Sequence, residues 1–171
     1  MGYGSLVESH CPWGEMMDCK IKTDRLVLYP ASDRQMQALI TKEDDPELKK
    51  AYSEMLDGCL REPFGRVWFA AWFLELREEP GVIVGDLCFK GAPKEGRVEI
   101  GYGLREGFCK KGYMREALRA IIEWAFLQPG VTALEAETEP QNIDSQKLLA
   151  ACGFLPTGEV GEEGPRFIRK K

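Results

Sequence analysis

The sequence has little histidine, no closely spaced cysteine pair and no long hydrophobic run. His10 is the single histidine among 171 residues, so neither a Cys–His nucleophile pair nor a histidine-rich metal site is indicated. The six cysteines are scattered without a Cys-x-x-Cys motif, which favours small buried thiols in a reducing compartment over disulfides. His10, Cys11 and Cys19 could be imagined as metal ligands. No second close pair completes such a site, so we expect no metal.

The sequence also lacks a basic excess. Lys and Arg number 23 against 28 Asp and Glu, and the resulting net charge of −5 argues against nonspecific nucleic-acid binding. The acidic balance is compatible with a cationic substrate such as an amine. No run is long enough to span a bilayer, and the first twenty residues lack the apolar block of a signal peptide. We expect a cytoplasmic protein that binds neither nucleic acid nor membrane.

Length and composition predict one globular domain. A chain of 171 residues with 44% hydrophobic and 30% charged residues can bury a core without metal or disulfide support. Regular strand pattern begins only near Thr23. Residues 1–20 are therefore expected to be an extension, a start-site artefact or a disordered segment, and residues 21–171 a single domain.

Hydrophobic periodicity predicts a mixed sheet with helices between its strands. The pattern indicates strands over residues 25–30, 67–77, 82–90, 97–105 and 131–138, followed by a terminal hairpin from residue 154. Two helices are expected between residues 32 and 63, a third over 112–128 and a fourth over 142–152. The strand–helix–strand order over residues 98–138 is a right-handed βαβ crossover. The predicted class is α/β (α+β): a mostly antiparallel twisted sheet of about seven strands, four helices and a central crossover.

The helix over residues 112–128 has the clearest pattern in the chain. Its apolar positions recur at three- and four-residue spacing: Met114, Ala117, Leu118, Ile121, Ile122, Ala125 and Phe126. Just before it, Gly107 and Gly112 bracket the residues Phe-Cys-Lys-Lys. A helix start presents unpaired N–H groups and a positive dipole end, so this loop is either an anion site or a solvated turn. The glycine spacing fits neither a Walker loop nor a dinucleotide fingerprint.

The motifs from Val98 onward resemble those of a known family. The sequence reads VEIGYGLREGFCKKGYMREALRAIIEWAF and, further on, LEAETEPQNIDSQKLLAACGF. Its strand, glycine loop, Glu-Ala in the helix and Asn-x-x-Ser leading to Gly-Phe resemble the GNAT acetyltransferase superfamily, in particular its RimJ/RimL-like branch. TDRLVLYP resembles the first strand of that branch, so the resemblance runs from about Thr23 to the C-terminus. It implies a GNAT fold and an N-acetyltransferase that moves acetyl from acetyl-CoA to a primary amine, either a protein N-terminus or a small molecule.

The resemblance also implies a cofactor site. The loop would wrap the acetyl-CoA pyrophosphate with backbone N–H groups, through Cys109, Lys110, Lys111, Gly112, Tyr113 and Met114. Of the family pattern Gln/Arg-x-x-Gly-x-Gly/Ala, this loop keeps the middle glycine, and its two lysines could add positive charge. The strand at Tyr102 and Leu104 would splay from its neighbour, pair with the pantetheine arm and offer an N–H to the thioester oxyanion. Gly101 and Gly103 suggest a bulge there, and Asn142 is expected to be both a cofactor contact and a helix cap.

Two residues are candidates for the proton transfers of acetyl transfer. Glu99, on the same strand, is the candidate base through a water, although it could equally be a solvated strand glutamate. Ser145 is the candidate acid, or else a helix residue whose hydroxyl bonds the backbone. Many family members have a tyrosine seven residues after the Asn, where this chain has Leu149.

Two further alternatives stay open from the sequence. The aromatic residues Trp68, Phe69, Trp72 and Phe73 could line a substrate pocket, but core packing is the favoured interpretation. The chain could instead be a noncatalytic module that binds CoA or another anion as a sensor or scaffold. A homodimer is possible through an exposed terminal strand.

Overall fold

The computed structural model describes residues 19–171. His10, Cys11 and all of the expected 1–20 extension except Cys19 and Lys20 lie outside the described residues. The elements in chain order are β1 (Ile21–Lys22), β2 (Leu26–Pro30), α1 (Asp33–Lys42), α2 (Pro46–Arg61), the 3-10 helix η1 (Pro63–Trp68), β3 (Trp72–Leu76), β4 (Ile83–Phe89), β5 (Arg97–Leu104), α3 (Tyr113–Leu127), β6 (Ala133–Glu137), α4 (Ile143–Ala151), β7 (Leu155–Val160) and β8 (Pro165–Lys170).

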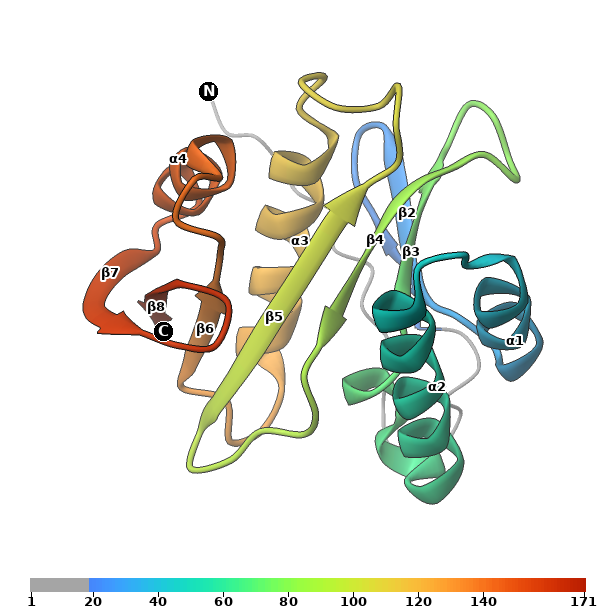
Figure 1. Ribbon diagram of the computed structural model, residues 1–171, viewed down its shortest axis with the longest axis horizontal. Coiled ribbons are helices and arrows are strands. Elements are labelled where there is room, and N and C mark those ends of the chain that lie inside the picture. Colours follow the sequence, from blue (N-terminus) through green and yellow to red (C-terminus); the bar gives the residue numbers. More distant parts are fainter. Residues whose placement is uncertain (1–18) are drawn as a thin grey trace.

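Eight strands form one sheet in the order β1-β2-β3-β4-β5-β6-β8-β7 (Figure 1). Among the strands within residues 19–171, only β5 and β6 pair in parallel, and α3 connects them. This confirms the mixed, mostly antiparallel sheet with a central βαβ crossover. The strand beyond the expected seven is β1, whose two residues are too few to show a periodic pattern. Among residues 19–171, no helix combines the length and apolarity needed to cross a membrane.

The strand predicted over residues 67–77 is wrong in its first part. Pro63–Trp68 form η1, and β3 begins only at Trp72. Pro63 presets a helical start, and the Trp72 indole N–H donates to the Val67 carbonyl oxygen at 2.8 Å. Trp68 packs against Phe89 and Trp124, with ring centroids 4.8 and 5.4 Å away. Tertiary packing of these aromatic rings therefore overrides their strand propensity.

The two faces of the sheet are covered by different helices. On one face of the sheet, paired residues of β3, β4 and β5 pack in the main core together with α3. These residues are Trp72, Leu87 and Tyr102. The opposite row is Phe73, Asp86 and Gly103. Phe73 there packs in a second cluster with Ala31 and Met36 from the α1 region. Figure 1 shows α3 behind β5 and the pair α1–α2 in front of the sheet. The favoured core interpretation is thus confirmed for Trp72 and Phe73, which are both buried.

The bulge expected at Gly101 and Gly103 is not present. The β4–β5 register runs without interruption from Gly85↔Leu104 to Phe89↔Ile100. The irregularity lies instead between β3 and β4, at Leu74/Glu75. Glycine tolerates a bulge but does not require one. A side-chain carbon at Gly103 would meet no heavy atom within 4 Å, whereas one at Gly101 would lie 3.5 Å from the Cys88 sulfur.

Candidate active site

The strands β5 and β6 separate after Glu99 pairs with Glu135, and we call this point the fork. Beyond it β5 continues to Leu104 beside β4, whereas β6 continues to Glu137 beside β8 (Figure 1). Along residues 100–104, no described strand pairs with the side of β5 that faces away from β4. An exposed strand edge of this kind can bind an extended ligand through main-chain hydrogen bonds. The expected splay at Tyr102 and Leu104 is confirmed, and the Leu104 side chain packs on the core while its main chain lies at this edge.

The loop that follows β5 ends in a left-handed turn at the start of α3. Gly112 is the N-cap residue, with φ 81° and ψ 3°, and no side chain caps the helix. The first hydrogen bond of the helix runs from the Glu116 N–H to the Gly112 carbonyl oxygen, at 3.1 Å. The N–H groups of Tyr113, Met114 and Arg115 therefore lack a helical acceptor. These donors and the positive end of the helix dipole form a place suited to a phosphate group.

The side chains of this loop divide into exposed and packed ones. Cys109, Lys110 and Lys111 are exposed, and the Lys110 ammonium lies 4.0 Å from the Asp144 carboxylate. The Lys111 ammonium lies over the Phe108 ring, 5.6 Å from its centroid. Tyr113 is half-buried and Met114 is buried in the core. Lysine charge is thus available beside the N–H groups, and the methionine side chain is directed away from them.

A set of polar contacts from the turn between β1 and β2 holds the loop in place. Glu116 accepts hydrogen bonds from the Thr23 hydroxyl at 2.6 Å, the Arg25 N–H at 2.8 Å and the Arg25 Nε at 2.7 Å. The Arg25 guanidinium also donates to the Lys111 carbonyl oxygen at 2.9 Å and lies 4.5 Å from the centre of the Tyr113 ring. Burial raises the pKa of Glu116, but the hydrogen bonds from Thr23 and Arg25 outweigh it and lower the pKa below its ordinary value. Glu116 is therefore held as a carboxylate.

Sequence reasoning missed this role of Arg25. The residue was part of a predicted strand, and its carboxylate partner lies 91 positions later. Pairing over such a separation leaves no mark in hydrophobic periodicity. Comparison of many related sequences could have found it, through covariation of the two positions.

Two candidate residues from different elements meet on the α3 side of the sheet. The Tyr102 and Ser145 hydroxyls are 2.8 Å apart, and either can donate. Asn142 caps α4 by accepting the Ser145 N–H at 3.0 Å, which confirms its expected role as a helix cap. Burial raises the pKa of Tyr102, and the hydrogen bond with Ser145 offsets part of that rise. The Ser145 hydroxyl thus bonds a phenol rather than the helix backbone, and both groups keep their protons at neutral pH.

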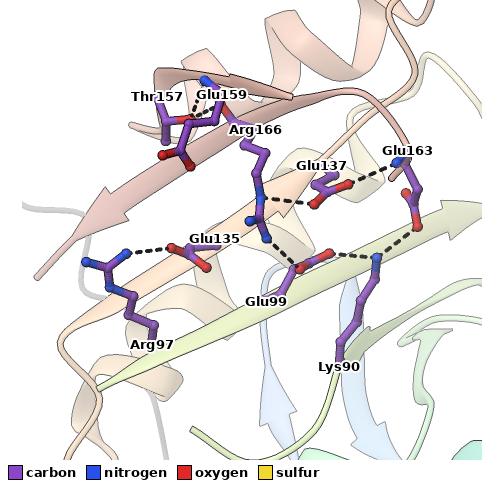
Figure 2. A network of polar contacts seen from close by, with 9 residues as sticks. All are labelled: Lys90, Arg97, Glu99, Glu135, Glu137, Thr157, Glu159, Glu163 and Arg166. Carbon is purple, nitrogen blue, oxygen red and sulfur yellow. Dashed lines mark hydrogen bonds and ion pairs between the residues drawn. The ribbon is translucent and has the colours of Figure 1, made fainter. Parts of the chain in front are cut away.

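Glu99 lies in a network of ion pairs at the fork (Figure 2). One carboxylate oxygen is 2.6 Å from the Lys90 ammonium and the other is 3.3 Å from the Arg166 guanidinium. Arg166 also binds Glu137 at 2.9 Å, and Lys90 also binds Glu163 at 2.8 Å. Arg166 therefore spans the two strands where they diverge. A water or an amine can reach the oxygens of Glu99 only in competition with two cations.

The geometry brings the predicted site residues to one end of the sheet. The open edge of β5 leads directly into the glycine loop at the start of α3, and the Tyr102–Ser145 pair lies beside that edge. Glu99 is placed at the base of the fork instead. Among the residues that the structure describes, no group of three or more His, Cys, Asp or Glu side chains could hold a metal ion. The arrangement can bind a ligand with a phosphate group and an extended arm, and it can supply a proton to that ligand.

Comparison with known proteins gives a consistent picture. Residues 22–155 match the family described as Acetyltransferase (GNAT) domain. A relative from Bacillus subtilis (strain 168), the uncharacterized N-acetyltransferase YjdG, is 35% identical over 92 residues. That match covers 53% of this chain and 54% of the relative, so the chain spans about half of the relative's length.

Solved structures share the architecture at low sequence identity. The ribosomal-protein-S5-alanine acetyltransferase from Vibrio fischeri superposes with a TM-score of 0.70 at 17% identity, covering 90% of this chain and 96% of that one. A RimL ribosomal L7/L12 alpha-N-protein acetyltransferase in complex with coenzyme A gives 0.64 at 17% identity, covering 86% and 95%. At such identities these structures show the fold alone.

Proposed function

Because the chain belongs to the Acetyltransferase (GNAT) domain family, we propose that it is an N-acetyltransferase that transfers acetyl from acetyl-CoA to a primary amine. The family match confirms the GNAT fold expected from the sequence. The observation that carries the proposal is the junction of the open β5 edge with the left-handed loop at Gly112. The RimL neighbour with bound coenzyme A supports it.

The residues present fit the chemistry of acetyl-CoA. The N–H groups of residues 112–115, with Lys110 and Lys111 nearby, would bind the pyrophosphate, and Cys109, Tyr113 and Met114 contribute only main chain. The edge of β5 at Tyr102 and Leu104 would bind the pantetheine arm. When bound, acetyl-CoA supplies the thioester carbonyl that an amine attacks. A main-chain N–H of β5 would hold its oxygen in place.

The leaving thiolate needs a proton, and Ser145 is the group that we propose to deliver it. Its hydroxyl shares a hydrogen bond with the Tyr102 phenol, which can in turn replace the proton. Leu149 is fully buried and stands where many members of the family have a tyrosine. The phenol beside Ser145 thus comes from β5 instead of from α4. Asn142 would contact the cofactor while it caps α4.

The role of base stays a prediction for Glu99. Both of its carboxylate oxygens contact cations, so it would have to release Lys90 or Arg166 to accept a proton. Glu99→Gln at saturating amine measures this role directly. An unchanged rate would leave Glu99 as a residue that only positions Arg166 at the fork.

The acceptor, location and assembly are further parts of the proposal. Two structural neighbours are acetyltransferases of ribosomal proteins, which supports a protein N-terminus as acceptor beside small amines. A cytoplasmic location is supported by the unpaired thiols Cys59, Cys88, Cys109 and Cys152. A homodimer could form through β7, an edge strand on which every residue is exposed.

Two measurements test the activity. Acetyl-CoA at 100 times its Kd should stabilise the protein by about 2.7 kcal/mol, seen as a rise in Tm. A panel of primary amines should then show acceptor-dependent release of CoA thiol. No rise in Tm at millimolar acetyl-CoA contradicts the proposal. A rise in Tm without thiol release for any amine, a peptide N-terminus included, would support the noncatalytic module.

A further inference from the structure

Asp86 is a carboxylate without a cationic partner on the α1–α2 face of the sheet. Its hydrogen-bonding partner among the described residues is the Tyr52 hydroxyl of α2, which lies 3.2 Å from Oδ2. No Lys, Arg or His in the described chain forms an ion pair with Asp86. A partly buried carboxylate that is bonded to a neutral phenol has no cation in direct contact to offset its charge.

The register places Asp86 beside the open edge of β5. Asp86 pairs with Gly103, which lies in the part of β5 beyond the fork. A side-chain carbon at Gly103 would meet no heavy atom within 4 Å, so there is open space over Gly103, the register partner of Asp86. Tyr102, one residue earlier, projects to the other face with Ser145. The carboxylate and the hydroxyl pair therefore lie on opposite faces of the edge where the thioester would be bound.

Two carboxylates at the fork, on the same side of the sheet, already contact cations. Glu99 contacts both Lys90 and Arg166, as Figure 2 shows. Glu137 is bound by Arg166 and accepts the Glu163 N–H at 3.0 Å. Asp86 differs from Glu99 and Glu137 in that a cation from outside the chain could complete its environment. A primary ammonium group has the charge and the donors for this.

The groups around Asp86 support this interpretation. Burial raises the pKa of Asp86, while the Tyr52 hydrogen bond and the charge of Arg105 act in the opposite direction and Glu43 raises it further. Cys88, two residues along β4, is partly exposed, and desolvation raises the pKa of its thiol to about 11, so it carries no charge at neutral pH. A carboxylate in a setting that disfavours its charge gains more from an ammonium partner than a solvated one does.

We propose that Asp86, with Tyr52, binds the ammonium group of the acceptor above Gly103 and takes its first proton. This inference rests on the proposed N-acetyltransferase function and adds the acceptor subsite to it. The acceptor is a primary ammonium ion.

Every proton that moves in this reaction has a donor and an acceptor. The ammonium R–NH3⁺ gives one proton to the Asp86 carboxylate and becomes the neutral amine R–NH2. The amine nitrogen forms a bond to the thioester carbon, the carbon–sulfur bond breaks, and the thiolate receives its proton from the Ser145–Tyr102 pair. The nitrogen loses its second proton, which restores that pair through solvent, and Asp86 releases its proton to water. The net reaction is R–NH3⁺ plus acetyl-CoA giving the amide, CoA–SH and one proton.

The test uses butylamine as the probe and the Gly103 amide as the reporter. The ¹⁵N-labelled full-length protein, saturated with CoA, is titrated with butylamine, and the shift of the Gly103 N–H gives a Kd. We expect Asp86→Asn to weaken butylammonium binding at least about tenfold, the effect of one charge-assisted hydrogen bond. Glu123→Gln, which replaces an exposed carboxylate on α3, is the control and should leave the Kd within about twofold. Butanol, which is uncharged, should bind wild type and Asp86→Asn alike.

The outcomes separate this inference from the activity itself. An equal Kd for wild type and Asp86→Asn, or no saturable shift at Gly103 in wild type, overturns the amine subsite. If an amine is acetylated although Asp86→Asn binds and reacts normally, the activity stands and the subsite falls. If butylammonium binds through Asp86 but no amine is acetylated, the subsite stands and the proposed activity falls. Circular dichroism and Tm of Asp86→Asn establish that the variant is folded.

Discussion

Glu116→Gln should destabilise the protein and loosen the loop at Gly112. The substitution keeps the shape of the side chain, and the amide oxygen can still accept the bonds from the Thr23 hydroxyl and the Arg25 main-chain N–H that now reach Oε1. The amide nitrogen would face the Arg25 Nε–H in place of Oε2, so that hydrogen bond is lost and two donors are opposed. The remaining two bonds lose the strengthening that a charged acceptor provides.

The size of the stability loss in Glu116→Gln depends on how far the Glu116 and Arg25 side chains are exposed to solvent. The Glu116 side chain is 18% exposed, so its bonds are only partly replaced by water, whereas Arg25 is 46% exposed and its charge is screened. Hydrogen bonds to charged groups contribute about 1.5–3 kcal/mol each when buried, and we expect a net loss of about 2 kcal/mol here. In a domain of this size that corresponds to a fall in Tm of about 4–8 °C.

The stability difference between wild type and Glu116→Gln should also depend on pH and become smaller in acid. The folded pKa of Glu116 is below its ordinary value, so its stabilisation is complete above the unfolded pKa of about 4.3 and is lost as the pH falls through the folded pKa. Urea unfolding of wild type and Glu116→Gln at pH 7 should differ by the full amount. The difference should shrink below about pH 4.3, because the amide that replaces the carboxyl group in the variant does not titrate.

The matched control is Glu123→Gln on the exposed side of the same helix. It removes one negative charge from α3 without touching Arg25 or Thr23, so its stability should stay within about 0.5 kcal/mol of wild type. A Glu116→Gln loss no larger than that of Glu123→Gln, or a loss that is the same at low pH, would refute the reasoning.

Three further substitutions test other parts of the structure. Gly112→Ala places a side-chain carbon at φ 81° and 3.3 Å from the Arg25 guanidinium, and should cost about 1–2 kcal/mol in urea unfolding while weakening acetyl-CoA binding by calorimetry. Ser145→Ala should lower kcat about 10²-fold with little change in acetyl-CoA affinity. Tyr102→Phe should lower kcat less, since only Ser145 would face the thiolate. Equal kcat values for both variants and wild type would remove the pair from catalysis. Asp86→Asn should be at least as stable as wild type at pH 7, because burial raises the pKa of Asp86 and so disfavours its ionised form in the folded state. The stability advantage of the variant should vanish as the pH falls through that raised pKa. A variant less stable than wild type at pH 7 would contradict this prediction.

The parts of the fold that were predictable are those with strong local patterns. The helix α3 has apolar residues at helical spacing and ends before Pro129 and Gly130, and the crossover between β5 and β6 follows from its length. The start of β3 was not predictable, because the run of tryptophan and phenylalanine residues favours a strand wherever packing does not decide. In this chain the conformation before β3 is set by tertiary packing, since Trp68 lies against Trp124 of α3.

The parts of the candidate site that are formed by main-chain groups were predictable from the sequence. Gly112 had to be a glycine for the left-handed turn, and Asn142 three residues before Ser145 is a capping pattern. Contacts between distant side chains were not predictable. The Tyr102–Ser145 hydrogen bond depends on how α4 packs near β5, and the two cations on Glu99 come from β8 and from the residue after β4.

The bridge that Arg166 makes across the fork has a consequence for folding. Arg166 lies 67 positions after Glu99, so a folding intermediate made of β1 to β6 would contain both strands of the fork without the residue that joins them. Long-range contacts of this kind form late, because the entropy of closing the intervening chain opposes them. In a refolding experiment, far-UV circular dichroism should therefore recover before the capacity to bind acetyl-CoA. Binding competence would belong to the completed sheet and not to the βαβ unit alone.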